Sequence, residues 1–596
     1  MPSSLTAQAF AQMLLSAMPS LHQSNGDLEA NDQRLSAIFE RLWQNSADGN
    51  ACIELSSDEQ SLLLYSPAKL LVGEDKPLML DHQALYLNRY WHAEKRLAQA
   101  VHLRLADLAV ATATQASLGL EEEAGSLTKL AENDQELAGL APEQIHALQA
   151  ALVGELTIIY GGPGTGKTRT IASLLTSYSR LHKKPIWVAA PTAKAGARLM
   201  QSLQALMAEE STTLNAEPDL LSKLAPDSTY LPTEAFTIQR LLSRLPATRI
   251  FFRDEDHPQA QWQGPGLLVV DEASMLSLEL CDQVFARLNK DCSLVLVGDP
   301  NQLHSVETGS VFAQLCAAEW PSLKASRVRL NRNFRQTNRR HLSELADGVL
   351  RGEVDPSLFV DELALTKPVL ATLIEAAAKR YAAILLHVQD QLPADACSTE
   401  RALAYLKAAS QYRLLSARRS GMAGADRISE AVLAKLKTIQ RLSQQSWFEG
   451  RLIIITRNDV DSGLLNGDIG VCVMDTDLSF ASDPGRSGLS RVLLVFERRG
   501  AVLAIPAAAL PHFQDGYCMS VHQSQGSEFD HVDFVAAPAE HRLATRELLY
   551  TAVTRAKSSL NIFGEWDDLQ WAASHPTVRH SRLAWRIDHP QENGLG

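Results

Sequence analysis

The stretch that decides the fold is Leu156-Thr157-Ile158-Ile159-Tyr160-Gly161-Gly162-Pro163-Gly164-Thr165-Gly166-Lys167-Thr168. Residues 156–160 form a short apolar run typical of a buried strand, and 169–175 continue with the residues of a helix. The glycine-rich segment between them fits the pattern G-x-x-x-x-G-K-[ST]. Its glycines allow backbone N–H groups to surround phosphate groups, and the helix N-terminus adds a partial positive charge. The stretch therefore predicts a phosphate-binding loop in an α/β domain.

The positions of this loop have expected roles in binding a nucleotide. Lys167 can reach the β- and γ-phosphates, and the Thr168 hydroxyl can bind Mg²⁺. The backbone around the phosphates would come from Gly161, Gly162, Pro163, Gly164, Thr165 and Gly166. The segment 457–459 is a poor match to the Asn-Lys-x-Asp element that recognises guanine. ATP and Mg²⁺ are therefore the expected cofactors.

Two carboxylates follow a second apolar run. Residues 267–270 lead directly into Asp271 and Glu272. The carboxyl end of a buried parallel strand is where a nucleotide site in an α/β sheet needs acidic groups. Asp271 can hold Mg²⁺, and Glu272 can orient and deprotonate an attacking water molecule. The pair favours ATP hydrolysis over a kinase-type transfer.

Three more side chains are candidates for contact with the γ-phosphate. Gln302 follows the run 293–297 and can hydrogen-bond to this group. Arg335 and Arg555 lie on either side of a long helical stretch, and either guanidinium can stabilise charge on the transferred phosphoryl group. As lone residues, these arginines would more often form surface ion pairs. The predicted catalytic residues are Lys167, Asp271, Glu272, Gln302, Arg335 and Arg555.

Outward from the loop, short apolar runs alternate with helical stretches, which predicts parallel sheets with crossover helices. The runs of a first region are 156–160, 185–190, 267–270 and 293–297, and those of a second region are 414–415, 452–456, 532–535 and 560–563. Gly-, Pro- and Ser-rich turns separate the short runs 469–474, 492–496 and 502–505, which predicts a small inserted β-barrel. Residues 1–110 are expected to be mostly helical, with no catalytic constellation.

The composition is that of a folded, multidomain protein. The 596 residues are 45% hydrophobic and 21% charged, which excludes collagen-like and disordered chains. A net charge of −13 argues against a protein that coats DNA with a basic surface, although a local basic groove is compatible with it. Seven cysteines without a CxxC pair favour a reducing compartment. With no Lys or Arg before Arg34 and no long apolar run, we expect a cytoplasmic protein without a membrane partner.

The order of the motifs resembles the superfamily 1 helicases, and most closely the RecD family, the alpha subunits of exodeoxyribonuclease V. Besides 161–168, the matching motifs are APTAK (190–194), TIQRLL (237–242), VDEASM (270–275), GDPNQL (298–303), NFR (333–335), TRND (456–459), LNGDIG (465–470), VHQSQGSEF (521–529) and LYTAVTRAK (549–557). The segment LYLNRYW (85–91) also looks like this family. Gln239 stands where the family often has His, and Gln523 where it often has Lys, so fine DNA contacts are in doubt.

The resemblance implies two RecA-like P-loop domains with ATP between them. Arg555 would come from the second domain, the other predicted catalytic residues from the first, and Gln144 would read the adenine. Single-stranded DNA would lie across both domains, in sequence-independent contacts with Pro191, Thr192, Lys194, Thr237, His522 and Ser524. Phe236, Phe334 and Phe513 are candidates for base stacking or for the core, and for Phe334 the core is favoured.

The resemblance also implies the activity, its direction and its partners. The family suggests a 5′→3′ translocase and DNA helicase that acts at duplex ends, with RecB-like helicase–nuclease and RecC-like subunits, in recombinational repair of double-strand breaks. No nuclease centre is visible in the sequence, so nuclease activity is assigned to the complex. The expected domains are a partner-docking domain (1–115) and a first motor domain (116–340). The second motor domain would consist of 341–466 and 516–596, and 467–515 would form an SH3-like barrel inserted into it.

Two alternatives remain at this point. A free-standing RecD-like helicase would carry helix-hairpin-helix repeats, and no Gly-x-Gly hairpin occurs in 1–110. A nucleotide-dependent structural subunit would not need the full hydrolytic set. Because 1–110 shows no site of its own, we expect it to dock onto a partner near Leu85, Tyr86, Tyr90 and Trp91.

Overall fold

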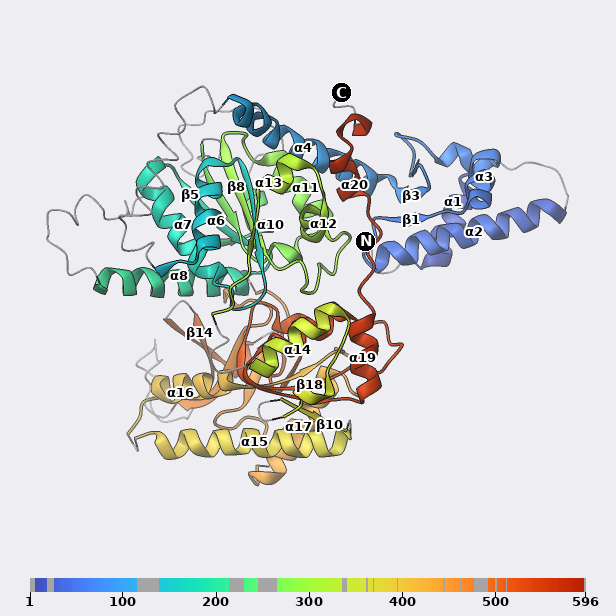
Figure 1. Ribbon diagram of the computed structural model, residues 1–596. Helices are drawn as coiled ribbons and strands as arrows, with labels where there is room; N and C mark the ends of the chain where they lie inside the picture. Colours follow the sequence, from blue (N-terminus) through green and yellow to red (C-terminus); the bar gives the residue numbers. More distant parts are fainter. Residues whose placement is uncertain are drawn as a thin grey trace.

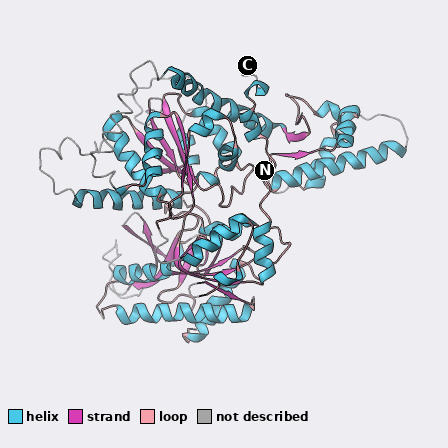
Figure 2. Cartoon of the chain, viewed as in Figure 1, coloured by secondary structure: helices cyan, strands magenta, loops and turns pink. Residues whose placement is uncertain are grey.

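The computed structural model describes residues 6–18, 26–114, 139–213, 230–244, 265–334, 340–360, 363–367, 369–393, 395–442, 445–459, 462–475, 491–498, 501–510 and 512–593. Figure 1 shows two α/β bodies, one above the other, and an N-terminal part that projects to one side. Figure 2 shows helices flanking the central sheets of both bodies. Within the described ranges, each helix is too short or too polar to cross a membrane.

The first α/β domain contains a six-stranded parallel sheet in the order β6-β5-β7-β8-β4-β9. Its strands are β4 (Leu156–Gly161), β5 (Ile186–Ala190), β6 (Ala235–Thr237), β7 (Gly266–Val270), β8 (Cys292–Gly298) and β9 (Arg327–Leu330). Its helices are α6 (Pro142–Val153), α7 (Lys167–His182), α8 (Ala193–Thr213), α10 (Ile238–Arg244), α11 (Leu278–Arg287), α12 (Val311–Ala317) and α13 (Pro321–Ala325), with the turn η4 (Ala273–Met275). The central strands are buried on both faces, as in other covered parallel sheets. The predicted parallel α/β architecture is confirmed here.

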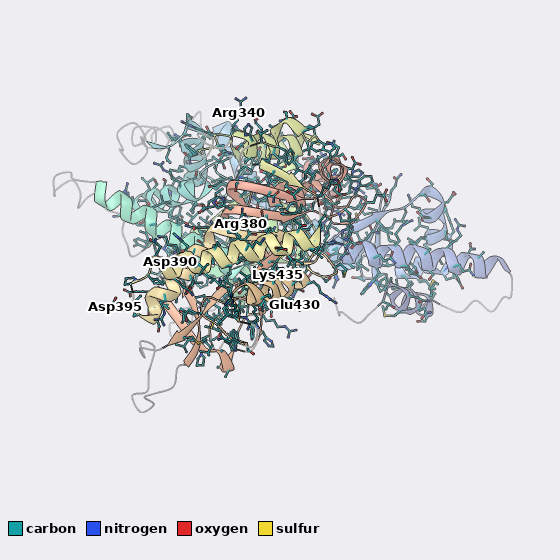
Figure 3. The ribbon with its side chains drawn as sticks, turned by 90° about the horizontal axis from the view of Figure 1, so that it is seen from below. Arg340, Arg380, Asp390, Asp395, Glu430 and Lys435 are labelled. Atoms are coloured by element: carbon teal, nitrogen blue, oxygen red, sulfur yellow. The ribbon has the colours of Figure 1, made fainter. Side chains whose placement is uncertain are left out.

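The second α/β domain contains a five-stranded parallel sheet in the order β10-β19-β18-β11-β17. Its strands are β10 (Leu363–Thr366), β11 (Tyr412–Ser416), β17 (Cys518–Ser520), β18 (Phe529–Val535) and β19 (Ala556–Phe563). Its helices are α14 (Arg340–Arg351), α15 (Leu370–Gln391), α16 (Ser398–Gln411), α17 (Ala425–Ile439), α18 (Arg546–Val553) and α19 (Trp566–Ser574), with the turns η6 (Pro356–Leu358) and η8 (His522–Ser524). In Figure 3, charged side chains of α15 and α17, including Arg380 and Lys435, lie on the outer face of this domain.

A five-stranded antiparallel sheet accompanies the second domain, in the order β15-β14-β13-β12-β16. Its strands are β12 (Leu452–Ile455), β13 (Ile469–Asp475), β14 (Arg491–Arg498), β15 (Ala501–Pro506) and β16 (Phe513–Asp515). The short turn η7 (Ala507–Ala509) lies between β15 and β16. The assignment of 452–456 to the second parallel sheet is wrong, because β12 pairs with β13 and β16. A buried apolar strand reads the same in either sheet, since pairing partners are set by long-range contacts. Closure of this sheet into a barrel stays a prediction.

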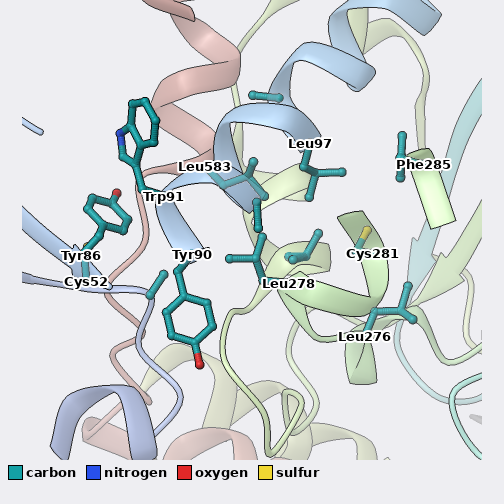
Figure 4. Packing of buried hydrophobic residues seen from close by; sticks show 14 of the residues in the cluster. Cys52, Tyr86, Tyr90, Trp91, Leu97, Leu276, Leu278, Cys281, Phe285 and Leu583 are labelled. Atoms are coloured by element: carbon teal, nitrogen blue, oxygen red, sulfur yellow. The ribbon is translucent and has the colours of Figure 1, made fainter. Parts of the chain in front are cut away.

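The N-terminal region combines helices with a small antiparallel sheet in the order β1-β3-β2. Its helices are α1 (Ala7–Ser16), α2 (Gly26–Ala47), α3 (Ser57–Tyr65) and α4 (Asn88–Thr114), with η1 (Pro67–Leu71), and its strands are β1 (Cys52–Glu54), β2 (Leu78–Asp81) and β3 (Ala84–Leu87). Leu85, Tyr86, Tyr90 and Trp91 are buried in a cluster that includes residues of α11 (Figure 4). The predicted docking through these four residues is therefore wrong, because they fill the core of this chain.

The C-terminal segment after α19 returns to the N-terminal region and ends in α20 (Leu583–Asp588) and η9 (Pro590–Asn593). Leu583 joins the same apolar cluster as Trp91 (Figure 4). The buried Arg586 forms ion pairs with Asp81 and with Glu94, the latter at 3.5 Å. The carboxylate of Asp588 accepts the backbone N–H of Trp320 at 2.7 Å. The described part of the N-terminal region thus shares one core with the first α/β domain and the C-terminal segment.

Candidate nucleotide site between the two α/β domains

The predicted phosphate-binding loop connects β4 to α7 and has the backbone that such a loop needs. Gly164 and Gly166 have φ angles of 80° and 82°, in the left-handed region that favours glycine. The Thr165 hydroxyl donates to Gly162 O at 2.8 Å and closes the turn. The Lys167 ammonium donates to Gly161 O at 2.8 Å and to Gly162 O at 2.9 Å. An incoming phosphate would compete with these two carbonyl oxygens for the ammonium group.

Two side chains from outside the loop contact its end. Gln144 of α6 is buried, and its amide accepts the N–H of Ala141 and donates to Gly166 O and to the Thr170 hydroxyl. An adenine contact would require Gln144 to exchange one of these partners, so that role stays a prediction. Phe334 donates its backbone N–H to Gly164 O at 3.0 Å, and its side chain is 43% exposed. The prediction that Phe334 belongs to the core is wrong, because its ring lines the cavity beside Gly166.

Asp271 and Glu272 follow β7 at the edge of the sheet where the loop also lies. The Asp271 N–H donates to Ala189 O at 2.9 Å, which places the carboxylate next to the end of β5. Burial, and then the charge of Glu272, raise the pKa of the Asp271 carboxyl. A cation would lower this pKa again, so a buried carboxylate here fits a metal ligand. Glu272 has a φ of 52°, an uncommon conformation for a non-glycine residue that turns the chain sharply at the site.

The loop after β8 carries Gln302 into the interface between the domains. Asp299 and Gln302 are both buried. Asp299 Oδ1 accepts the N–H of Asn301 at 3.0 Å, and Oδ2 accepts the Gln302 amide at 3.2 Å. The next residue, Leu303, donates its N–H to the Thr551 hydroxyl of α18 at 3.0 Å. The loop that carries Gln302 is thus hydrogen-bonded directly to the second domain.

Arg555 approaches the site from the second domain. Its side chain is buried, and it donates from Nε to Thr551 O at 3.1 Å and from Nη1 to Ser527 O at 3.0 Å. Burial lowers the pKa of its guanidinium, while the charges of Glu272 and Glu528 act in the opposite direction. Arg335 lies outside the described residues.

A cavity of about 400 Å³ brings the predicted residues together. Lys167, Thr168, Asp271, Glu272 and Gln302 line it from the first domain, and Arg555 lines it from the second. Sequence reasoning missed Arg198, which lies on α8 in the same cavity, donates to Gly526 O and approaches Glu528 at 3.9 Å. A lone arginine within a helix has no motif that could have identified it.

The predicted DNA-contact residues of the first domain lie at strand and helix ends. The Thr192 hydroxyl accepts the Ala195 N–H, and the Thr237 hydroxyl accepts the Arg240 N–H, so both cap helices. Pro191 is half-buried beside Thr192. Lys194 donates to Gly467 O at 3.3 Å, and burial lowers the pKa of its ammonium to about 8. Both threonine hydroxyls keep their own proton for donation to another acceptor.

The two predicted DNA-contact residues of the second domain differ in accessibility. His522 is half-buried, and burial lowers the pKa of its imidazole. Ser524 is fully buried, and its hydroxyl donates to Val521 O at 2.7 Å. In this conformation Ser524 is out of reach of a ligand. Gln523 accepts the N–H and hydroxyl of Ser520, so its side chain closes the same turn.

Family models and curated relatives both match this chain. Residues 139–359 match the family model of an AAA domain, and 515–563 match that of a UvrD-like helicase C-terminal domain. The chain is 32% identical to the RecBCD enzyme subunit RecD of Mycolicibacterium smegmatis, over 90% of this chain and 91% of that protein. It is 30% identical to the subunit of the same name from Mycobacterium tuberculosis, over 93% and 86%. It is 26% identical to the ATP-dependent RecD2 DNA helicase of Deinococcus radiodurans, over 95% and 70%.

Proposed function

Since this chain belongs to the family of RecD subunits of the RecBCD enzyme, we propose that it is an ATP-dependent DNA helicase that moves 5′→3′ within a RecBCD-type complex. The observation that carries the proposal is the cavity between the two α/β domains. It joins Lys167, Asp271, Glu272 and Gln302 of one domain to Arg555 of the other. A nucleotide bound there would touch both domains, so its hydrolysis would change how they are held together.

The predicted catalytic side chains that line the cavity have places in ATP hydrolysis. Lys167 would leave the carbonyls of Gly161 and Gly162 and bind the β- and γ-phosphates. Glu272 would orient the attacking water and accept its proton, and Gln302 would donate to the γ-phosphate. Arg555 would stabilise the charge that develops on the transferred group.

Mg²⁺ fits the two groups that would hold it. Thr168 offers a hydroxyl at the start of α7, and Asp271 offers a half-buried carboxylate whose pKa is raised by burial and by the charge of Glu272, so that a nearby cation would stabilise its ionised form. Oxygen ligands of this kind suit Mg²⁺, which would neutralise charge on the phosphates. The chain's own contribution is to keep both oxygens in place around the phosphate-binding loop.

The DNA path would cross the ends of β5 and β6 and continue to the turn η8. Pro191, Thr192, Lys194 and Thr237 would contact the sugar–phosphate backbone in the first domain, and His522 in the second. Such contacts do not read sequence, which suits a motor that acts on any duplex end. Chromosomal DNA as the substrate agrees with the cytoplasmic location that the sequence predicts.

Unwinding of tailed duplexes tests the proposal. The purified chain should hydrolyse ATP faster with single-stranded DNA present, and it should displace a strand from a duplex with a 5′ single-stranded tail. A duplex with a 3′ tail is the control for direction. Absence of DNA-stimulated hydrolysis would reject the motor, whereas preference for the 3′ tail would reject only the proposed direction.

Partner docking is proposed for a different surface from the one first predicted. Tyr65 at the end of α3 is 91% exposed, and Leu70 of η1 is 58% exposed. Figure 1 places α3 at the outer end of the N-terminal part, away from both α/β domains. Large apolar side chains that are exposed together commonly mark interaction sites. We assign residues 64–70 to contact with a RecB- or RecC-like subunit.

Negative charges introduced within 64–70 should weaken assembly of the complex. We expect Tyr65→Glu with Leu70→Glu to weaken co-purification with RecB- and RecC-like chains by about 30-fold or more, because an anchor residue contributes about 2 kcal/mol or more. Deletion of 1–110 would expose the shared core and is not a usable test. Met422→Glu, at an exposed methionine of the second domain, is the matched control. Assembly at wild-type affinity would place the interface elsewhere.

Lys194 should make DNA binding depend on pH. With a pKa of about 8, its ammonium is mostly charged at pH 7, and about a tenth remains charged at pH 9. One lost phosphate contact should reduce the slope of log affinity against log salt by ~0.7 between these pH values. Lys194→Arg should keep the steeper slope at both pH values, and Lys194→Gln the shallower one. If Lys194→Gln has the wild-type slope at pH 7, Lys194 is not a DNA contact.

A further inference from the structure

Asp299 is a buried carboxylate that receives donors from both α/β domains. It is 1% exposed. Its Oδ2 accepts the Gln302 amide at 3.2 Å and also the Tyr550 hydroxyl of α18 at 3.1 Å. The Tyr550 oxygen also lies beside the phosphate-binding loop, since a Cβ atom added at Gly162 would be 3.1 Å from it. One phenol of the second domain therefore contacts the carboxylate that holds Gln302.

Tyr550 belongs to a short segment that also positions Arg555. The neighbouring Thr551 accepts the N–H of Leu303 through its hydroxyl, and its backbone carbonyl accepts Nε of Arg555. Gln525 of the second domain donates to Leu303 O at 3.0 Å. Two hydrogen bonds thus join the loop 299–303 to the segment 550–555. Each of these two parts carries one residue that is expected to contact the γ-phosphate, Gln302 and Arg555.

The two donors on Asp299 Oδ2 have different consequences when a nucleotide binds. If Gln302 turns to a γ-phosphate, the N–H that its amide donates to Asp299 leaves Oδ2. A buried carboxylate oxygen that loses its donor costs free energy, more than for a neutral group. The Tyr550 hydroxyl remains on the same oxygen and keeps it satisfied. The phenol therefore makes the release of Gln302 less costly.

We propose that Tyr550 is a positioning residue. By holding Asp299, it allows Gln302 to turn to the γ-phosphate and keeps Gln302 aligned with Arg555. This inference rests on the proposed function and adds a residue to it. Tyr550 does not touch the phosphates in this scheme, and it acts through Asp299. Its removal should therefore affect the rate of hydrolysis and leave ATP binding by the phosphate-binding loop unchanged.

The test is Tyr550→Phe, which keeps the ring and removes the hydroxyl. We expect kcat for DNA-stimulated hydrolysis to fall about tenfold, the size of one hydrogen bond to a charged group, with KM for ATP changed less than about twofold. Tyr412→Phe is the matched control, because the Tyr412 hydroxyl also donates to a buried carboxylate, that of Asp533, at 2.7 Å. This pair lies next to Arg380 of α15, on the outer side of the same domain (Figure 3). An unchanged kcat in Tyr550→Phe, or an equal loss in Tyr412→Phe, would overturn the proposal.

A second variant tests the route through Asp299. In an Asp299→Asn background the acceptor is neutral, so loss of the phenol should lower kcat by clearly less than in the wild type. The same loss in both backgrounds would show that Tyr550 does not act through this carboxylate.

Hydrogen exchange separates this inference from the motor itself. In the nucleotide-free protein, Tyr550→Phe should increase exchange in 299–303, and Tyr412→Phe should not. If the wild type lacks DNA-stimulated hydrolysis, the proposed function fails, and the exchange result still decides whether Tyr550 holds the loop. Unchanged exchange in 299–303 would reject that link.

Discussion

Replacement of Arg555 by alanine should lower the rate of DNA-stimulated ATP hydrolysis by ~10³–10⁵-fold, the range for an arginine that acts on a phosphoryl transition state. The guanidinium lines the cavity from the second domain, while the phosphate-binding loop lies in the first. Nucleotide affinity should change much less, because Lys167 and the loop backbone remain. Single-turnover hydrolysis and titration with a fluorescent nucleotide would measure the two effects separately.

The controls for Arg555 address charge and folding. Arg555→Lys keeps the positive charge and loses the planar fork, so we expect an intermediate rate. Arg340→Ala removes an exposed arginine that pairs with Glu344 on the same helix, and it should leave hydrolysis unchanged (Figure 3). Because Arg555 also donates to Ser527 O and Thr551 O, thermal unfolding must show that the alanine variant is folded. Equal losses of affinity and rate would make Arg555 a ground-state binding residue.

Lys167→Gln should reduce hydrolysis by about 10²–10³-fold or more while the fold is kept, since one preorganised charge at the reacting phosphate is lost. The glutamine amide can still donate to Gly161 O or Gly162 O, the partners of the ammonium group in the nucleotide-free structure. The loop should therefore keep its conformation, which circular dichroism and thermal unfolding would check.

A lysine at the opposite end of the sheet provides the control. Lys290 is exposed and precedes β8, whereas the phosphate-binding loop follows the carboxyl end of the neighbouring β4. Lys290→Gln should hydrolyse ATP at the wild-type rate. Near-normal turnover in a folded Lys167→Gln variant would contradict the assignment of this loop as the site of hydrolysis.

Local pattern was enough to predict the parallel α/β regions and the phosphate-binding loop. The loop needs glycine at its left-handed positions and a lysine at a fixed distance from a strand, and both requirements are visible within 156–168. Asp271, Glu272 and Gln302 each follow a buried strand, and parallel strands end at the same edge of a sheet. For these residues, sequence position alone implied that they would meet.

Residues that meet across domains could not be placed in the same way. Tyr86 and Trp91 looked suited to an interface, and the structure buries them against α11 and α20. Strand β12 reads as a strand from its composition, but only pairing with β13 and β16 assigns it to the antiparallel sheet. Although Phe334 is apolar, it lies in the cavity, because the hydrogen bond from its backbone N–H to Gly164 O places it there.

The sequence by itself determined which segments are strands and helices around the nucleotide site, because strand and helix periodicity and loop geometry are local properties of the chain. The family resemblance, and not local pattern, placed Arg555 at the nucleotide, and the structure has it in the same cavity as Glu272. Only the tertiary structure decided that Tyr550 shares Asp299 with Gln302, and that the N-terminal aromatics are covered. These contacts join residues that are hundreds of positions apart. Their geometry depends on how separately formed sheets pack and on which buried polar groups need partners, and neither can be read from a window of sequence.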